Sequence, residues 1–305
     1  LMVEGWDVTA LHRPSSDLTF LSRFGPRLAV GEITDRASLL AAIPQGTDTL
    51  FHVAGNTSMW RKLDAEQTRD NVDGTRNVVE AAKAKGVRRL IVTSSISAYG
   101  PVSGEVTETT PSLADKSSVN YERTKWQAQE IARAAVGDGL EVVIMQPGAI
   151  MGPYDIGTWS RMFLMVRDGK LPGVPPAQLS FAHVREIVGA HIAAADRGES
   201  GGQYLLAGEN STMLELVTEI GLLLGKSTPK KPLPLGLMRV AATVGGFVSS
   251  LTGKEPSMTA EMVEAFSHPM TTQSAKAQRD LGYKIVPLKE MVKDCHDWMV
   301  AEGRI

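Results

Sequence analysis

A tyrosine and a lysine one helical turn apart are the residues in this chain best suited to chemistry. Tyr121 and Lys125 lie in a run that is typical of a helix ending near Ala135. Four residues make about one helical turn, so both side chains project from the same face. A nearby ammonium favours the phenolate and lowers the pKa of a phenol from its usual value near 10. We therefore expect Tyr121 to act as an acid or base near neutral pH.

Ser95 precedes this pair and follows a short apolar run, residues 89–94, that predicts a strand. Its hydroxyl would then lie at the carboxyl end of a sheet, which is where open α/β sheets bind ligands. The alternative is that Tyr121 and Lys125 are only a solvated pair on a helix surface. Among the five tyrosines, however, Tyr121 alone has a lysine four residues later. This spacing after a Thr-Ser-Ser strand end predicts Ser95, Tyr121 and Lys125 as the catalytic residues.

The composition indicates an ordinary globular protein of one or two domains. The chain has 305 residues, 43% of them hydrophobic and 22% charged, and a net charge of −2. This balance suggests neither a nucleic-acid partner nor an anionic membrane. The single cysteine, Cys295, excludes an internal disulfide and fits a reducing compartment, so we expect a cytoplasmic location. The six scattered histidines show no metal-ligand spacing, and no metal site is predicted.

One apolar segment, residues 233–251, resembles a membrane helix in length. Pro234, Arg239 and several glycines and serines interrupt it. We predict a helical cap over a site, with no membrane contact; a membrane-associated helix is the alternative.

Strands alternate with helices in the first half of the chain. Short apolar runs predict strands at residues 8–11, 28–30, 49–54, 90–93 and 142–145, with helices at 38–43, 65–85 and around Tyr121. This alternation predicts an α/β fold, a doubly wound parallel sheet of the Rossmann type. After Gly152 prolines break the pattern. We predict a Rossmann domain over residues 1–152 and a smaller substrate-binding region over residues 153–305, partly interleaved with the sheet.

The first residues read as the end of a helix that is capped by Gly5. A dinucleotide fold has a strand and a glycine-rich turn before such a helix, and neither is found near this end. We expect about 20 residues upstream that carry this first strand and turn.

Six short motifs, taken in order, resemble the extended short-chain dehydrogenase/reductase family, the NAD-dependent epimerase/dehydratase group. Within it the chain looks most like dihydroflavonol-reductase-like proteins. The matching segments are residues 51–55, 71–75, 93–100, 121–125, 146–153 and 181–184.

The resemblance implies roles for individual residues. Tyr121 would be the proton donor or acceptor, Lys125 would also hold the nicotinamide ribose, and Ser95 would bind the reacting oxygen. The residues that would contact the cofactor are Val53, Ala54, Gly55, Asn71, Pro147 to Ile150, and the adenine-flanking Glu32 and Ile33. For Asn71, a cap or kink in its helix is the equal alternative. His52 and His183 are predicted to be structural.

The cofactor preference depends on the segment after the second strand of the family fold. No carboxylate is present there to bind a ribose 2′-hydroxyl, whereas Arg13 could bind a 2′-phosphate. The sequence therefore predicts a preference for NADP(H), with NAD(H) possible; an exposed loop arginine is the alternative.

The predicted reaction is reduction of a carbonyl to a secondary alcohol. No acid follows Ser95, so dehydration is not expected. Nucleotide-sugar epimerisation and a non-catalytic dinucleotide-binding module are the alternatives. The apolar residues within 154–176, together with 233–251, predict a small-molecule substrate that is partly apolar, although core packing explains them equally well. The family resemblance also implies a homodimer through the two long helices, whose apolar faces are formed by Val72, Val78, Val79, Ala81, Ala82, Ala128, Ile131, Ala132 and Ala135.

Overall fold

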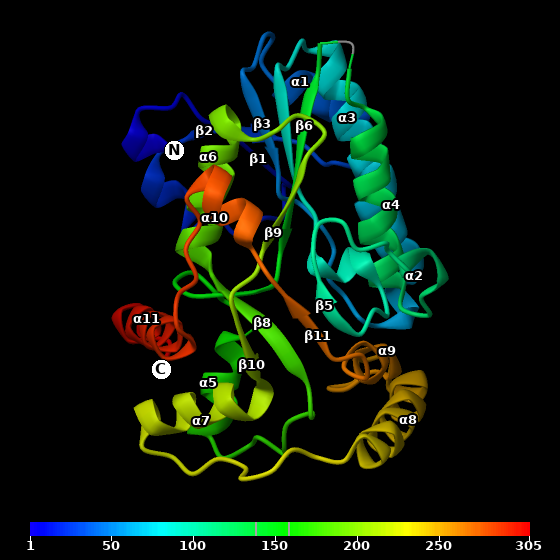
Figure 1. Cartoon of the computed structure of the whole chain (residues 1–305), viewed down its shortest axis with the longest axis vertical. Coiled ribbons are helices and arrows are strands. Elements are labelled where there is room, and N and C mark those ends of the chain that lie inside the picture. Colours follow the sequence, from blue (N-terminus) through cyan, green and yellow to red (C-terminus); the bar gives the residue numbers. More distant parts are fainter. Residues whose placement is uncertain (138, 158) are drawn as a thin grey trace.

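The computed structural model describes residues 1–137, 139–157 and 159–305 (Figure 1). The strands are β1 (Thr9–His12), β2 (Arg27–Val30), β3 (Thr49–His52), β4 (Arg89–Thr93), β5 (Gly104–Val106), β6 (Glu141–Pro147), β7 (Ala149–Met151), β8 (Gln178–His183), β9 (Gln203–Leu206), β10 (Glu209–Thr212) and β11 (Met270–Thr272). The helices are α1 (Arg36–Ala42), α2 (Asp64–Thr68), α3 (Gly74–Ala84), α4 (Asn120–Ala134), α5 (Ser160–Arg167), α6 (Val184–Arg197), α7 (Met213–Leu224), α8 (Leu235–Thr252), α9 (Ala260–Ala265), α10 (Ala275–Leu281) and α11 (Leu288–Ala301).

A four-stranded parallel sheet, in the order β3-β4-β6-β9, forms the centre of the molecule. Successive side chains of a strand face opposite sides of the sheet. Leu90 and Val92 accordingly pack with α1, α3 and α4, whereas Ile91 packs with α6 and α10 on the other face. Figure 1 shows these two helical layers on either side of the strands. The predicted α/β fold of the Rossmann type is confirmed.

β1 and β2 form a separate parallel pair. Within the described residues, β1 and β3 each lack a strand partner on one side, so this pair is separate from the four-stranded sheet where one continuous sheet was predicted. Both sheets nevertheless present the carboxyl ends of parallel strands, which is the feature that positions a site.

The second half of the chain contributes to both parts of the molecule. β9 and α6 belong to the central sheet and its cover, in line with the interleaving that the sequence suggested. The remaining elements build a smaller region around the sheet β10-β8-β7, with α5, α7 and α11 packed on it. Phe163 of α5 is fully buried in this core. The apolar residues of α5 therefore serve core packing, the alternative that the sequence left open.

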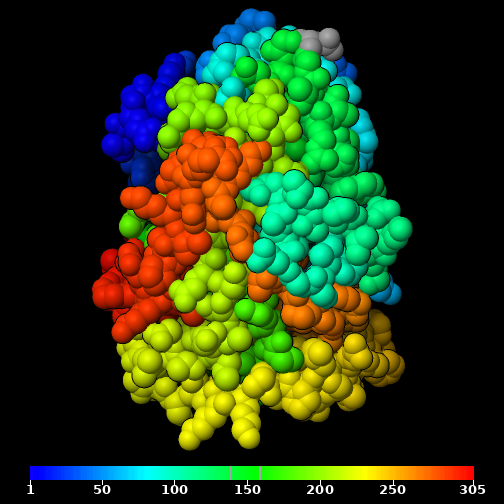
Figure 2. Space-filling model, viewed as in Figure 1, coloured from blue at the N-terminus to red at the C-terminus, as the bar shows by residue number. Residues whose placement is uncertain are grey.

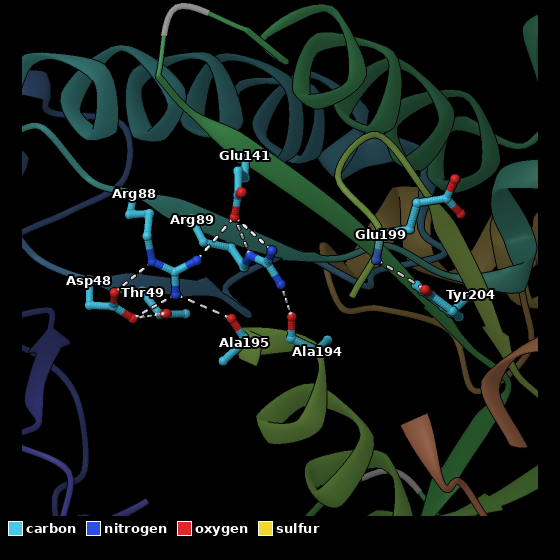
Figure 3. Close-up of polar contacts among 9 residues, drawn as sticks. All are labelled: Asp48, Thr49, Arg88, Arg89, Glu141, Ala194, Ala195, Glu199 and Tyr204. Carbon is cyan, nitrogen blue, oxygen red and sulfur yellow. Dashed lines mark hydrogen bonds and ion pairs between the residues drawn. The ribbon is translucent and has the colours of Figure 1, made fainter. Parts of the chain in front are cut away.

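The amino ends of the central strands are joined by ion pairs (Figure 3). Arg88 pairs with Asp48 at 2.7 Å and with Glu141 at 3.0 Å, which links the starts of β3, β4 and β6. The buried Arg89 also pairs with Glu141 and donates to the Ala194 carbonyl of α6 at 2.7 Å. Hydrogen bonding from Arg88 lowers the pKa of Asp48 to about 2. This network fixes the amino ends of the central strands, so the carboxyl ends are left for function.

One expectation about the long helices is confirmed and another is wrong. The helix expected over residues 65–85 runs without a break from Asp64 to Ala84, with a π-helical segment (Arg69–Asp73) between α2 and α3. The apolar faces expected to form a dimer interface are buried within the chain itself. Val78 and Ala82 of α3 and Ala132 of α4, for example, pack against β4 and β6. These faces had been assigned to a partner because the family resemblance implied a dimer through these helices, and an apolar face does not itself show what covers it.

Candidate active site

Helix α4 brings two of the predicted catalytic side chains to the carboxyl end of β4. The Lys125 ammonium donates to the Thr93 carbonyl at 2.9 Å. The Tyr121 phenol, one turn earlier on α4, interacts with the Ser95 hydroxyl through a hydrogen bond. Thr93 is the last residue of β4 and Ser95 follows two residues later. The spacing seen in the sequence therefore produces one cluster at one edge of the sheet.

Ser95 is held in place by its local structure. It is the N-cap of a short 3₁₀ helix, Ile96–Tyr99, and its hydroxyl oxygen accepts from the Ser97 amide at 3.1 Å. Capping satisfies a helix amide that would otherwise lack a partner. The side chain is 8% exposed. Its hydroxyl is thereby oriented toward Tyr121 and keeps a proton that it can donate.

The electrostatics of the pair differ from the expectation. Burial raises the pKa of Tyr121, and the hydrogen bond from Ser95 only partly opposes this effect. Burial also lowers the pKa of Lys125 to about 8. The prediction that the Lys125 ammonium lowers the phenol pKa is wrong for this arrangement, because Lys125 is directed to the Thr93 carbonyl. At neutral pH the chain therefore presents a protonated phenol, which is a proton donor.

Asn71 lies in the π-helical segment and connects three elements. Its side-chain oxygen accepts from the Asn56 amide at 2.7 Å, and its side-chain nitrogen donates to the Asn56 carbonyl at 2.9 Å and to Thr124 at 3.1 Å. A π turn is frequent at functional sites. Asn71 therefore lies at an irregularity in its helix and also beside the site, so the two alternatives given for it do not exclude each other.

Most of the predicted cofactor-binding residues lie at or just after the carboxyl ends of parallel strands. Arg13 follows β1, Glu32 and Ile33 follow β2, residues 53–55 follow β3, and Pro147 ends β6. Val53 is 66% exposed even though it is apolar. Arg13 is also exposed, and within the described residues its guanidinium forms no hydrogen bond or ion pair.

Not every one of these residues is free to contact a ligand. Ile33 packs against Gly74 of α3, and its carbonyl accepts from Asn77 at 3.0 Å. Glu32 beside it is exposed. Ile150 is half-buried within β7. Gly148, between Pro147 and β7, has no room for a side chain, since an added Cβ would lie 2.3 Å from the Ser180 carbonyl oxygen.

A buried amide network behind the site was missed in the sequence. Gln129 Oε1 accepts from Ser94 at 3.0 Å and from Gln146 at 2.9 Å, and Gln146 in turn accepts from Tyr99. Gln129 is four residues after Lys125, so its position on the same face of α4 was the available signal. Lys125 and Gln129 also line an internal cavity of about 10 Å³, roughly the space of one water molecule.

His52 and His183 both make contacts that are structural. Burial lowers the pKa of His52 to about 4, and its Nε2 is 3.0 Å from the Thr75 hydroxyl. His183 caps α6, accepting from the Arg185 amide at 3.0 Å. Among the described residues, no group of His, Cys, Asp and Glu side chains could hold a metal ion.

The residues present fit the nicotinamide half of a dinucleotide. Gly55 lies beside Asn71 and Lys125, and a Cβ there would fall 3.4 Å from the amide oxygen and 3.6 Å from the ammonium. The exposed backbone of residues 53–55 therefore opens directly onto the Lys125 ammonium. A ribose hydroxyl is the kind of group that an ammonium in this position binds.

Known proteins resemble this chain in sequence and in fold. The model of the NAD dependent epimerase/dehydratase family matches residues 1–207. A putative dihydroflavonol 4-reductase from Synechocystis sp. is 29% identical, over 100% of this chain and 91% of that protein.

Two solved structures share the fold. The crystal structure of gox2253 has a TM-score of 0.83 and 31% identity, covering 100% of this chain and 93% of that one. PA4631, a nucleoside-diphosphate-sugar epimerase from Pseudomonas aeruginosa, has a TM-score of 0.78 and 25% identity, covering 99% of this chain and 92% of that one.

Proposed function

Because the chain belongs to the NAD dependent epimerase/dehydratase family, we propose that it is an NADP(H)-dependent reductase that converts a carbonyl to a secondary alcohol. The observation that carries this proposal is the Ser95–Tyr121–Lys125 cluster, in which the phenol is held in its protonated form. Reduction needs a proton donor beside the carbonyl oxygen. A reaction that begins by removing a proton from an alcohol needs a phenolate instead.

Tyr121 donates its proton to the oxygen as charge develops on it. A nicotinamide cofactor, when bound, would supply the hydride for the carbonyl carbon. Ser95 donates a second hydrogen bond to the same oxygen, and its N-cap geometry keeps the hydroxyl oriented before substrate arrives. Lys125 would bind the ribose, and the Ser95 hydroxyl, whose hydrogen bond favours the phenolate, stabilises the phenolate that remains after proton transfer.

The surroundings favour a substrate of low charge. A sugar-nucleotide substrate carries a diphosphate, which needs several convergent cations. In the region proposed to bind substrate, Arg167 and Lys170 are both paired with Asp168, at 2.8 Å and 3.4 Å. Asp168 thus competes for the cations that a diphosphate would require. The similarity to a putative dihydroflavonol 4-reductase is in line with a partly apolar ketone.

Epimerisation of a nucleotide sugar is the second candidate. It is supported by the similarity to PA4631, described as a nucleoside-diphosphate-sugar epimerase. The two candidates differ in how they use the cofactor. An epimerase regenerates its cofactor in each cycle and retains it, whereas a reductase must exchange it. We expect native protein to be purified largely without cofactor. Tightly retained cofactor, with turnover seen only for nucleotide sugars, would favour the epimerase.

The preference for NADP(H) follows from Arg13. Its exposed guanidinium, which is free of intramolecular ion pairs among the described residues, is available for a 2′-phosphate at the end of β1. Titration of the native protein with both cofactors tests this preference. Arg13→Gln is expected to weaken NADP(H) binding at least tenfold while leaving NAD(H) binding within about twofold. Tighter binding of NAD(H) to the wild-type protein would contradict the proposal.

The catalytic assignment is tested by conservative substitution at the site. Tyr121→Phe removes only the phenolic oxygen, so we expect turnover to fall below a few per cent while cofactor binding is retained. Lys125→Ala is expected to impair both. A ketone and aldehyde screen that follows NADPH absorbance, with nucleotide sugars in parallel, identifies the substrate class. Substantial activity in Tyr121→Phe would refute the role of this residue.

A further inference from the structure

Most of helix α8 is exposed to solvent and is not covered by the rest of the protein. Its buried residues are Met238, Ala242 and Ser249. The helix has a mean hydropathy of 1.3, and by length and composition alone it could cross a membrane. The sequence had suggested a cap over a site, but in the structure α8 packs mainly on α9. An apolar helix that covers so little of its own protein needs another explanation.

The residues of α8 divide into three faces. Successive residues are about 100° apart around a helix, which places the buried residues on one face and Arg239, Thr243 and Ser250 on a second. The third face is about 120° wide and wholly apolar. We call it the α8 apolar stripe; it consists of Leu237, Val240, Val244, Phe247, Val248 and Leu251, with exposures from 49% to 73%.

Positive charge surrounds the stripe. Residues 226–254 contain five cations and no aspartate or glutamate, in a chain whose net charge is −2. These cations are Lys226, Lys230, Lys231, Arg239 and Lys254. All five are free of ion pairs with the described residues. Glu255 follows directly, so residues 226–255 have a net charge of +4, and this local excess in an otherwise slightly acidic protein is complementary to an anionic surface.

Apolar side chains are also exposed at the end of α7. Leu222 and Leu223 at the end of α7 are 71% and 38% exposed. Leu222 and Lys226 line an open groove of about 370 Å³. Helix α7, the connection that follows it and α8 together form the lower end of the molecule in Figures 1 and 2. Apolar and cationic groups are thus gathered on one end of the protein.

We propose that this end docks on an anionic lipid surface, with α8 lying in the plane of the interface. The stripe would enter the acyl boundary while the flanking lysines contact acidic headgroups. A spanning orientation is incompatible with the structure, since one face of α8 packs on the protein and Arg239 lies near its middle. A second copy of the chain is less suited to cover the α8 apolar stripe. Antiparallel pairing of two stripes brings Lys254 near Lys230 and Lys231, and parallel pairing brings each lysine near itself.

Vesicle cosedimentation of the full protein tests the proposal. We expect binding to phosphatidylcholine vesicles that contain phosphatidylglycerol, and at least tenfold weaker binding to phosphatidylcholine alone. Phe247→Glu with Leu251→Glu should reduce binding to anionic vesicles at least tenfold. The matched control, Val188→Glu with Val300→Glu, alters residues of similar exposure on α6 and α11 and should bind as the wild type does.

A second pair of variants isolates the charge. Lys230→Glu with Lys231→Glu should abolish the preference for anionic vesicles, whereas Lys284→Glu with Lys289→Glu makes the same change in net charge elsewhere and should preserve it. Thermal unfolding verifies that each variant is folded. Equal binding to both vesicle types, equal losses in variant and control, or a dimer by light scattering that Phe247→Glu dissociates would each overturn the proposal. Loss of vesicle binding with retained carbonyl reduction separates this inference from the proposed reaction.

Discussion

Replacing Lys125 by methionine should stabilise the protein while destroying its activity. The pKa of Lys125 is about 8, against 10.5 for an ordinary lysine, because burial disfavours the ammonium. Each pKa unit corresponds to about 1.4 kcal/mol, so at pH 7 the charged side chain reduces the free energy of unfolding by up to about 3 kcal/mol. Methionine has a similar length and no charge. It loses the hydrogen bond to Thr93, which is worth about 1 kcal/mol, and a net gain of about 2 kcal/mol remains.

The pH dependence distinguishes this explanation from a general packing effect. A lysine whose pKa is lowered on folding destabilises the native state below its folded pKa. This penalty disappears as pH rises from about 8 through 10.5. Wild-type stability should therefore rise relative to Lys125→Met, and the difference between them should shrink by about 2 kcal/mol between about pH 7 and about pH 9.5.

Urea unfolding at the two pH values, at constant ionic strength, measures this difference. The control Lys289→Met removes an exposed lysine of α11. A difference between wild type and Lys125→Met that is constant with pH would refute the reasoning. So would a Lys125→Met variant less stable than the wild type at neutral pH.

The remaining predictions concern three other features of the chain. Burial lowers the pKa of His52 to about 4, so wild-type stability should fall relative to His52→Gln as pH falls from about 6.5 to 4. The expected loss is up to about 3 kcal/mol in urea unfolding, and a difference that does not depend on pH would contradict this. Asn71→Leu leaves the Asn56 amide without its partner and removes one of the two hydrogen bonds to the Asn56 carbonyl, which still accepts from Gln67. It should lower stability by about 1–3 kcal/mol in urea unfolding and should reduce kcat; unchanged stability would contradict this. A homodimer is still expected, and light scattering at micromolar concentration that found only monomer would count against it.

Much of the fold was predictable because it depends on short-range patterns. Short apolar runs identified the central strands, and their alternation with helices indicated the parallel sheet. The Tyr121–Lys125 spacing placed both residues at the end of β4 because helix geometry leaves little choice once the helix is recognised. These inferences needed no knowledge of what lies opposite each face.

The errors all concern interactions between distant segments. Sequence periodicity could not tell that Val78 and Ala132 face the chain's own sheet, or that α8 faces outward. The orientation of the Lys125 ammonium toward the Thr93 carbonyl, rather than the phenol, depends on side-chain geometry that spacing does not fix. The joint role of Gln129 and Gln146 requires two residues that are far apart in the sequence to meet in a buried network.

The π turn at residues 69–73 has a consequence for insertions and deletions. A π turn holds one residue more than an α turn, so it behaves as a single-residue insertion absorbed inside a helix. Removing one residue there would restore ordinary α geometry and leave α2 and α3 in their present phase. The hydrogen bonds from Asn71 to Asn56 and Thr124 would be lost, while the face of α3 that covers the sheet would stay in place. We therefore expect a one-residue deletion in this segment to abolish function while the fold is preserved.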